Sequence, residues 1–174
     1  MLPSIAILCL AAAVILLAIL SLIDLRVRLL PNVYVLPFAL TGIIFHAATQ
    51  TAFLSVGDIA AGAATGFLLL YLLRAAANWY YQQDALGLGD VKLMGAAGIW
   101  LGLDGILFAL TLGALAGVVH GLGYAAYTSI KHKTPFTLSR LEIPAGPGFA
   151  VGIVGVGVWL YGPFVLDFVH DIFA

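Results

Sequence analysis

Long apolar runs dominate this chain of 174 residues and restrict it to folds that a lipid bilayer can cover. The first run, Ile5–Ile23, contains no charged side chain, and only 9% of all residues are charged. Because 63% of the residues are hydrophobic, a soluble domain of this length could not bury all of its apolar surface. Because crossing about 30 Å of hydrocarbon takes around 20 helical residues, these runs predict transmembrane helices.

Six such helices are predicted, which makes the chain an all-α, polytopic membrane bundle with one domain, residues 1–174. The apolar region after Asp90 is too long for one helix, and the stretch Gly102–Gly105 divides it. No basic residue precedes the first run, so we expect a retained helix and not a cleaved secretory signal. The predicted helices cover residues 5–23, 33–49, 59–77, 91–103, 106–130 and 148–168.

The basic residues predict how the bundle is oriented. If the helices alternate from an outside N-terminus, every Lys and Arg falls on the cytoplasmic side, which agrees with the positive-inside rule. The other side then carries acidic residues only. The net charge of −1 gives no reason to expect a nucleic-acid partner. We therefore expect a multi-pass protein of the cytoplasmic membrane whose main loops lie in the cytoplasm.

Small residues recur at four-residue spacing along several predicted helices. Such spacing lets helix backbones approach closely in a bilayer, so it predicts a compact bundle and carries no chemistry of its own. The pairs and triplets are Gly62/Gly66, Gly98/Gly102, Gly113/Gly117/Gly121 and Gly148/Gly152.

Two aspartates are placed where a predicted helix meets the cytoplasmic face. Asp24 ends the first apolar run, and Asp90 opens the fourth helix after a Gly-Leu-Gly sequence. Taken alone, Asp90 is explained as a helix N-cap, and Asp24 as an interfacial residue beside Arg26 and Arg28. Both explanations are compatible with a catalytic role for the same residues.

A pair of facing aspartates has a specific chemical use. The two like charges cannot both ionise at short range, so the pair shares one proton. The ionised member can take a proton from water while the protonated member polarises a peptide carbonyl. This chemistry needs no metal ion or cofactor, and none is predicted.

The length of the fourth helix leaves the depth of Asp90 open. If the helix covers Val91–Leu101, it is roughly 16 Å long and begins inside the hydrocarbon layer. A carboxylate at that depth is a candidate functional group because it needs a partner or water. If the helix instead continues to about Gly105, Asp90 lies at the interface.

Two segments resemble the signature segments of the type IV prepilin peptidases, which are membrane aspartic proteases of the GxGD type. DLRVRLLPN (24–32) is similar to the first signature, and GLGDVKLMGAAGIWLG (87–102) is similar to the second. A weaker third similarity is IPAGPGFAVG (143–152). The first two segments agree with the family in order, spacing and side of the membrane.

The resemblance implies a role for individual residues. Asp24 and Asp90 would be the catalytic pair, and Gly87 and Gly89 would give the backbone the freedom to present Asp90. Lys92 would anchor the helix at the interface. Pro31 and Asn32 would set the start of the second helix. Possible contacts with substrate fall at Asp84, Pro144, Gly146 and Pro147.

The implied activity is removal of short basic leader peptides from prepilin-like proteins of pilus or secretion systems, after a glycine and at the cytoplasmic face. Bifunctional family members also N-methylate the product, and they carry an insert between the first two helices, often with paired CxxC motifs. Here only Leu25–Asn32 lies between those helices, and Cys9 is the only cysteine. We therefore expect the short, peptidase-only form, similar to Tad/Flp-type or archaeal relatives, without methyltransferase activity.

Other classes of protein remain as alternatives. Presenilin-type proteases share GxGD, but they pair it with Tyr-Asp and Pro-Ala-Leu, whereas here Ile23 precedes Asp24 and the later tripeptide is Pro-Ala-Gly. A small proton-coupled transporter would place a carboxylate near the middle of the bilayer. A non-catalytic assembly subunit would need the aspartates only for capping.

Overall fold

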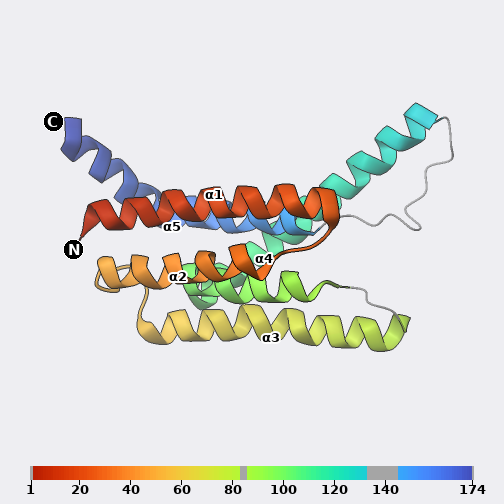
Figure 1. The fold of residues 1–174 in the computed structure, drawn as a ribbon, viewed down its shortest axis with the longest axis horizontal. Coiled ribbons are helices and arrows are strands. Elements are labelled where there is room, and N and C mark those ends of the chain that lie inside the picture. Colours follow the sequence, from red (N-terminus) through yellow and green to blue (C-terminus); the bar gives the residue numbers. More distant parts are fainter. Residues whose placement is uncertain (1, 83–85, 133–144, 174) are drawn as a thin grey trace.

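The computed structural model describes residues 2–82, 86–132 and 145–173, and the regular secondary structure of these residues is entirely helical. Figure 1 shows an elongated bundle with both termini near the same end. The helices are α1 (Pro3–Val27), α2 (Asn32–Ala48), α3 (Val56–Tyr81), α4 (Leu88–His132) and α5 (Gly146–Phe173).

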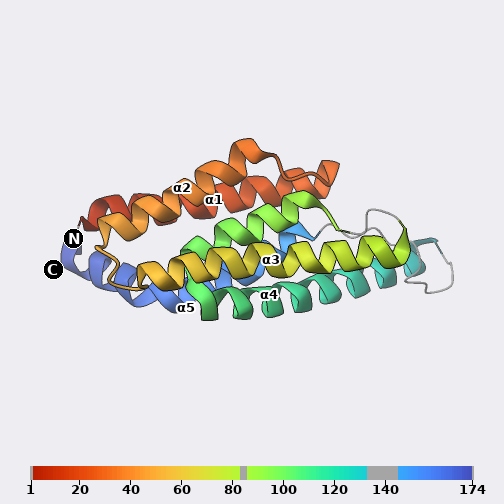
Figure 2. The same ribbon diagram turned by 90° about the horizontal axis from the view of Figure 1, so that it is seen from below.

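The helix α4 changes direction at Gly102. This glycine has φ 69° and ψ −172°, a backbone conformation that side chains with a Cβ rarely adopt. The part of α4 before Gly102 runs back along α3, and the part after it returns toward the other end (Figures 1 and 2). The reversal predicted at Gly102–Gly105 is therefore present. The described residues form five helices where the sequence predicted six, because the break in α4 is made by Gly102 alone and no loop intervenes.

Most helices extend beyond their predicted ends. The first apolar run was predicted to end at residue 23, but α1 continues to Val27 and so includes Asp24. The third was predicted to end at residue 77, but α3 continues to Tyr81. Hydropathy marks where side chains become polar, whereas the helical hydrogen bonds continue for another turn beyond that point.

The composition of the helices makes this a multi-pass membrane protein. By length and hydropathy, α1, α3, α4 and α5 can each cross a bilayer, and α2 is a shorter apolar helix of 17 residues. Large apolar side chains cover the outside, including Leu72, Val158 and Trp159, which are each more than 60% exposed. Such a surface suits lipid and not water.

Glycines bring the backbones of α3, α4 and α5 into direct contact. A Cβ added to Gly98 in α4 would lie 2.1 Å from the carbonyl oxygen of Gly62 in α3. A Cβ on Gly152 in α5 would lie 2.2 Å from the oxygen of Ala109 in α4. The predicted close packing is confirmed at these positions, but Gly117 has nothing within 4 Å of its Cβ position.

An aromatic cluster joins α2 and α5 to the first part of α4. The Trp100 Nε1–H donates to the Phe38 oxygen in α2 at 2.8 Å, and the Tyr161 hydroxyl of α5 donates to the Trp100 oxygen. His46 in α2 is paired through Nε2 with the Ile99 oxygen at 3.0 Å. These bonds pair polar groups inside the bundle, where an unpaired group is costly. Nδ1 of His46 has no partner among the described residues.

We expect Gly98→Ala to lower the thermal stability of the purified protein in detergent, because the new methyl group overlaps the backbone of α3. Overpacking of this kind costs about 1–3 kcal/mol. The matched control is Gly117→Ala in the same helix, which should be neutral or stabilising by up to about 1 kcal/mol because it meets open space. Equal melting temperatures for the two variants would contradict the packing described.

Candidate active site

The first signature segment forms the end of α1 and a tight connection to α2. Asp24 lies in the last turn of α1 and is 5% exposed. Arg28 then adopts a left-handed conformation with φ 53°, and its N–H donates to the Asp24 carbonyl oxygen at 2.9 Å. Pro31 is extended, and α2 begins at Asn32. The connection therefore holds only four residues between the two helices.

The second signature segment begins α4. Asp90 is the third residue of this helix and is 9% exposed, so it does not occupy the N-cap position predicted for it. Its side chain instead reaches back to the backbone N–H of Gly87, the residue that precedes the helix. A side chain that bonds backward to the N-cap amide in this way is one half of a capping box. Asp90 thus caps the helix from inside its first turn.

The third segment reaches Asp24 through a backbone amide. The Gly146 N–H donates to Oδ2 of Asp24 at 2.8 Å, and Gly146 is the first residue of α5. A Cβ added to Gly146 would lie 2.7 Å from the same oxygen, so a larger residue would displace the carboxylate. Gly146 was predicted to contact substrate, but its described contact is with Asp24.

All three segments therefore meet at one place, and they bring the two carboxylates together. The Asp24 charge acts electrostatically on Asp90, as does the Arg28 cation on Asp24. Oδ1 of Asp90 is buried and has no hydrogen-bond partner among the described residues. A buried carboxyl oxygen without a partner is unusual in a folded protein, and a catalytic role is one of the explanations for such a group.

Two further contacts fix the second segment in place. A Cβ on Gly89 would lie 2.8 Å from the Leu30 Cβ, so the glycine lets the second segment pack directly on the first. The Lys92 ammonium donates to the Asn32 amide oxygen at 3.1 Å. Lys92 was predicted as an interfacial anchor, and in the structure it joins the two segments.

Arg74 was not among the predicted site residues. Its Nε–H donates to the Leu86 oxygen at 2.7 Å, which holds the chain just before α4 against α3. In the sequence, Arg74 stands out only as a single cation near the C-terminal end of the third predicted helix, which is mostly apolar. Of the other predicted residues, Pro147 is half-buried in the first turn of α5, whereas Asp84 and Pro144 lie outside the described residues.

Asp90 is recessed from the end of α3. The part of α4 before Gly102 has 14 residues, or about 21 Å of helix, which is shorter than the hydrocarbon layer. Met94 lies against Gly66 of the antiparallel α3, so Asp90 lies near the level of Leu70. Because α3 continues to Tyr81, it extends roughly 16 Å beyond this level. The alternative in which the fourth helix runs straight to Gly105 is wrong.

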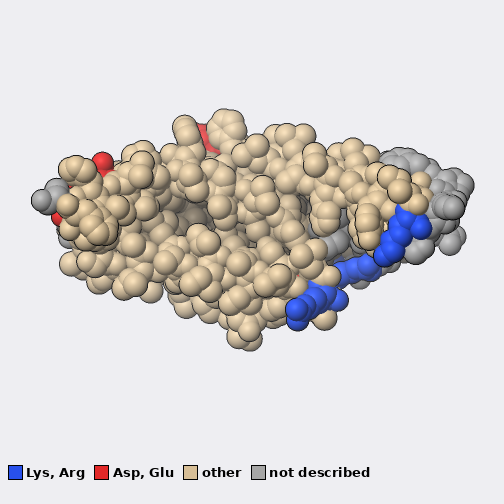
Figure 3. All heavy atoms as spheres, turned by 90° about the horizontal axis from the view of Figure 1, so that it is seen from above, with Lys and Arg blue, Asp and Glu red and all other residues tan. Residues whose placement is uncertain are grey.

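The charged side chains are distributed unevenly between the two ends of the molecule. In Figure 3 the Lys and Arg side chains gather at one end, and the visible acidic side chains lie nearer the other. Arg26, Arg28 and Lys92 are exposed at the end that holds the two aspartates. Asp58 and Asp104 lie around the Gly102 turn, at the opposite end of the first part of α4.

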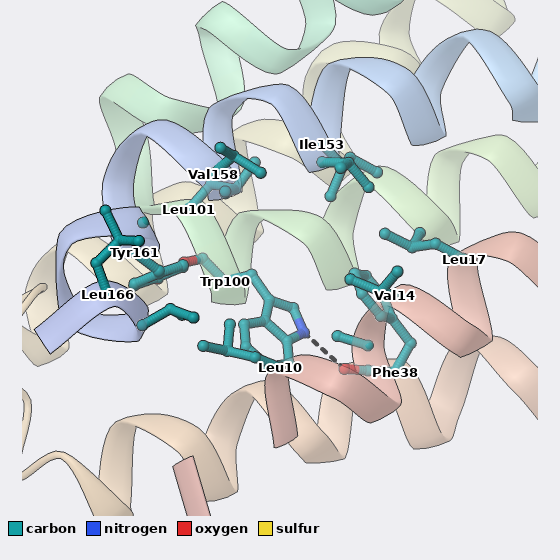
Figure 4. A pocket seen from close by; sticks show the side chains of 15 residues that line it. Leu10, Val14, Leu17, Phe38, Trp100, Leu101, Ile153, Val158, Tyr161 and Leu166 are labelled. Carbon is teal, nitrogen blue, oxygen red and sulfur yellow. Dashed lines mark hydrogen bonds between the residues drawn. The ribbon is translucent and has the colours of Figure 1, made fainter. Parts of the chain in front are cut away.

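An apolar cavity lies between α1 and α5 (Figure 4), and neither Asp24 nor Asp90 is among the residues that line it. Its volume is about 400 Å³, and its lining includes Leu10, Leu17 and Ile153. The polar groups of Trp100 and Tyr161 that border it already donate to backbone oxygens. The residues that line this cavity therefore offer no free polar group for catalysis.

The comparisons with known proteins agree with this arrangement. The prepilin leader peptidase/N-methyltransferase of Aeromonas hydrophila is 33% identical over 132 residues, which cover 76% of this chain and 42% of that protein. The corresponding protein of Escherichia coli strain K12 is 32% identical over 133 residues, covering 76% and 55%. A type 4 prepilin-like proteins leader peptide-processing enzyme of Escherichia coli O78:H11 is 34% identical over 132 residues, covering 76% and 44%.

The chain thus spans about half the length of these curated relatives. No solved structure matches it. A family model described as the type IV leader peptidase family matches residues 11–122, a range that contains both Asp24 and Asp90. Because this match covers more than half of the chain, the protein belongs to the type IV leader peptidase family.

Proposed function

We propose that this protein is a membrane-embedded aspartic endopeptidase and that Asp24 and Asp90 are its catalytic residues. The observation that carries the proposal is the meeting of two buried carboxylates from distant segments, each held by a backbone amide. Placing one such group in an apolar bundle is costly, and placing two together is more so. A protein that only needed to cap its helices would not have to bring the two charges together.

The pair can hydrolyse a peptide bond without a covalent intermediate. With one proton shared between them, one aspartate acts as a base on a water molecule, and the other donates to the oxygen of the scissile carbonyl. Positioning both groups on the ends of packed helices supplies the orientation that this reaction requires. The unpartnered Oδ1 of Asp90 provides a place for one of these contacts.

The substrate class follows from the family and from the charges. Relatives are named as leader peptidases of prepilins or prepilin-like proteins, and we infer substrates of this class, cleaved after a glycine beside a short basic leader. The proposed orientation places the aspartate end in the cytoplasm, with the N-terminus outside and six membrane crossings, α4 contributing two. The exposed cations at that end support this orientation.

The absence of methyltransferase activity also stays a prediction. Relatives are named as N-methyltransferases as well as peptidases, and the matched residues cover only 42% and 55% of their length. The connection between α1 and α2 has only four residues, so no insert stands at that position. We expect purified protein to cleave a prepilin without transferring a methyl group from a methyl donor.

We expect Asp24→Asn and Asp90→Asn each to lower prepilin cleavage at least about 100-fold, because Asn keeps the size of the side chain but cannot exchange the proton. The measurement is cleavage of a co-expressed prepilin reporter, followed by the shift in its size on a gel. The protein level of each variant in the membrane serves as the control for folding. Cleavage at the wild-type rate by either variant would rule out the aspartate pair.

The orientation is tested with single cysteines at the two ends of α2. In a Cys9→Ala background, Leu29→Cys lies at the aspartate end and Ala52→Cys lies at the other, and both positions are exposed. A membrane-impermeant maleimide should label the cysteine at position 52 in intact spheroplasts, and the one at position 29 only after permeabilisation. The reverse pattern would place the aspartates outside the cytoplasm.

A further inference from the structure

The two candidate catalytic carboxylates have similar first contacts. Each accepts one backbone N–H at the N-terminal end of a helix, Asp24 from Gly146 of α5 and Asp90 from Gly87 before α4. Amide donors and the positive end of a helix both favour the ionised form of a carboxyl group. Because both residues receive this support, these contacts alone do not distinguish them.

Their remaining surroundings differ. Asp24 lies in the last turn of α1, whose dipole disfavours a negative charge, but the Arg28 cation acts on it in the opposite sense. For Asp90, Oδ1 is buried without a partner among the described residues. An unpaired buried oxygen costs far more as part of a charged carboxylate than as part of a neutral carboxyl group. When the pair shares one proton, the state with that proton on Asp90 is therefore lower in free energy than the state with it on Asp24.

We propose that the two aspartates have fixed and different roles: Gly146 holds Asp24 as the ionised base, and Asp90 is the acid that donates its proton through Oδ1. This assignment rests on the proposed peptidase function. In this assignment Gly146 is a positioning residue. Its amide donates to the Asp24 carboxylate, and its lack of a Cβ leaves room for that carboxylate. A Cβ at this position would lie 2.7 Å from Oδ2 of Asp24 and 3.0 Å from its Cγ.

The reaction is balanced with these roles. The Asp24 carboxylate takes a proton from water while the water oxygen bonds to the scissile carbonyl carbon, and the carbonyl oxygen takes the proton of Asp90. The resulting gem-diol then collapses: the C–N bond breaks, the leaving nitrogen takes the proton from Asp24, and one diol hydroxyl returns its proton to Asp90. Both aspartates regain their starting forms, and one water is consumed.

The assignment predicts unequal residual activities for the two Asn variants. In Asp90→Asn the amide N–H can still donate to the carbonyl oxygen, whereas Asp24→Asn has no base. Since one donor to a developing oxyanion contributes about 10²–10³ in rate, Asp90→Asn should retain at least about tenfold more turnover than Asp24→Asn. Asp90→Ala, which has no donor, should fall to the level of Asp24→Asn.

These rates are measured with the purified full chain and a synthetic prepilin peptide in lipid nanodiscs. Residual turnover of Asp24→Asn that equals or exceeds that of Asp90→Asn, including loss of both below detection, overturns the assignment. A wild-type protein that cleaves no prepilin instead contradicts the proposed function itself. The two failures are thus distinguished within one assay.

The role of Gly146 is tested by Gly146→Ala, with Gly155→Ala in the same helix as its matched control. A Cβ at Gly155 meets only one Leu112 atom, at 4.0 Å. Because the new methyl group displaces Asp24 and not the substrate, Gly146→Ala should lower kcat about 10²-fold with KM changed less than about twofold. The control should keep both values. A change in KM alone, or an unchanged kcat, would show that Gly146 does not act through Asp24.

Discussion

A carboxylate buried in an apolar bundle must find hydrogen-bond donors, and in this protein backbone amides supply them. Gly146 donates to Asp24 and Gly87 donates to Asp90, each at the N-terminal end of a helix. Each donor gives its carboxylate a hydrogen-bond partner inside the bundle, where an unpaired polar group is costly. The positions of α4 and α5 are therefore tied to the aspartates, because each helix must begin where it can reach its carboxylate.

Glycine makes this arrangement possible both along the helices and at the helix ends. Along the helices, Gly62 and Gly98 allow α3 and α4 to touch through their backbones, which sets the position of Asp90 beside α3. At the helix ends, Gly89 leaves room for Leu30, and Gly146 leaves room for the Asp24 carboxylate. Glycine thus allows the helices to pack closely, and it also allows the backbone to approach the two carboxylates.

The sequence was sufficient for the parts of the structure that depend on composition and on motifs. Apolar runs predicted the helices, and Gly102 was recognised as part of the reversal. The family resemblance implied that Asp24 and Asp90 act as a pair, and the structure places the two carboxylates within electrostatic range. The amide of Gly146 and the Arg74 bond to Leu86 were not predicted, because a backbone donor has no side-chain signature and its partner depends on how distant helices pack.

The recessed position of the aspartates follows from the short first part of α4. Because Gly102 ends this part near the start of α3, Asp90 lies well inside the level that α3 reaches at Tyr81. If the protein acts as the proposed peptidase, a substrate has to bring its scissile bond down beside α3. A leader attached directly to an apolar helix suits this geometry, since the helix can remain in the bilayer while the adjoining bond reaches the recessed pair. In the proposed peptidase, the break at Gly102 would thus contribute to substrate choice as well as to the fold.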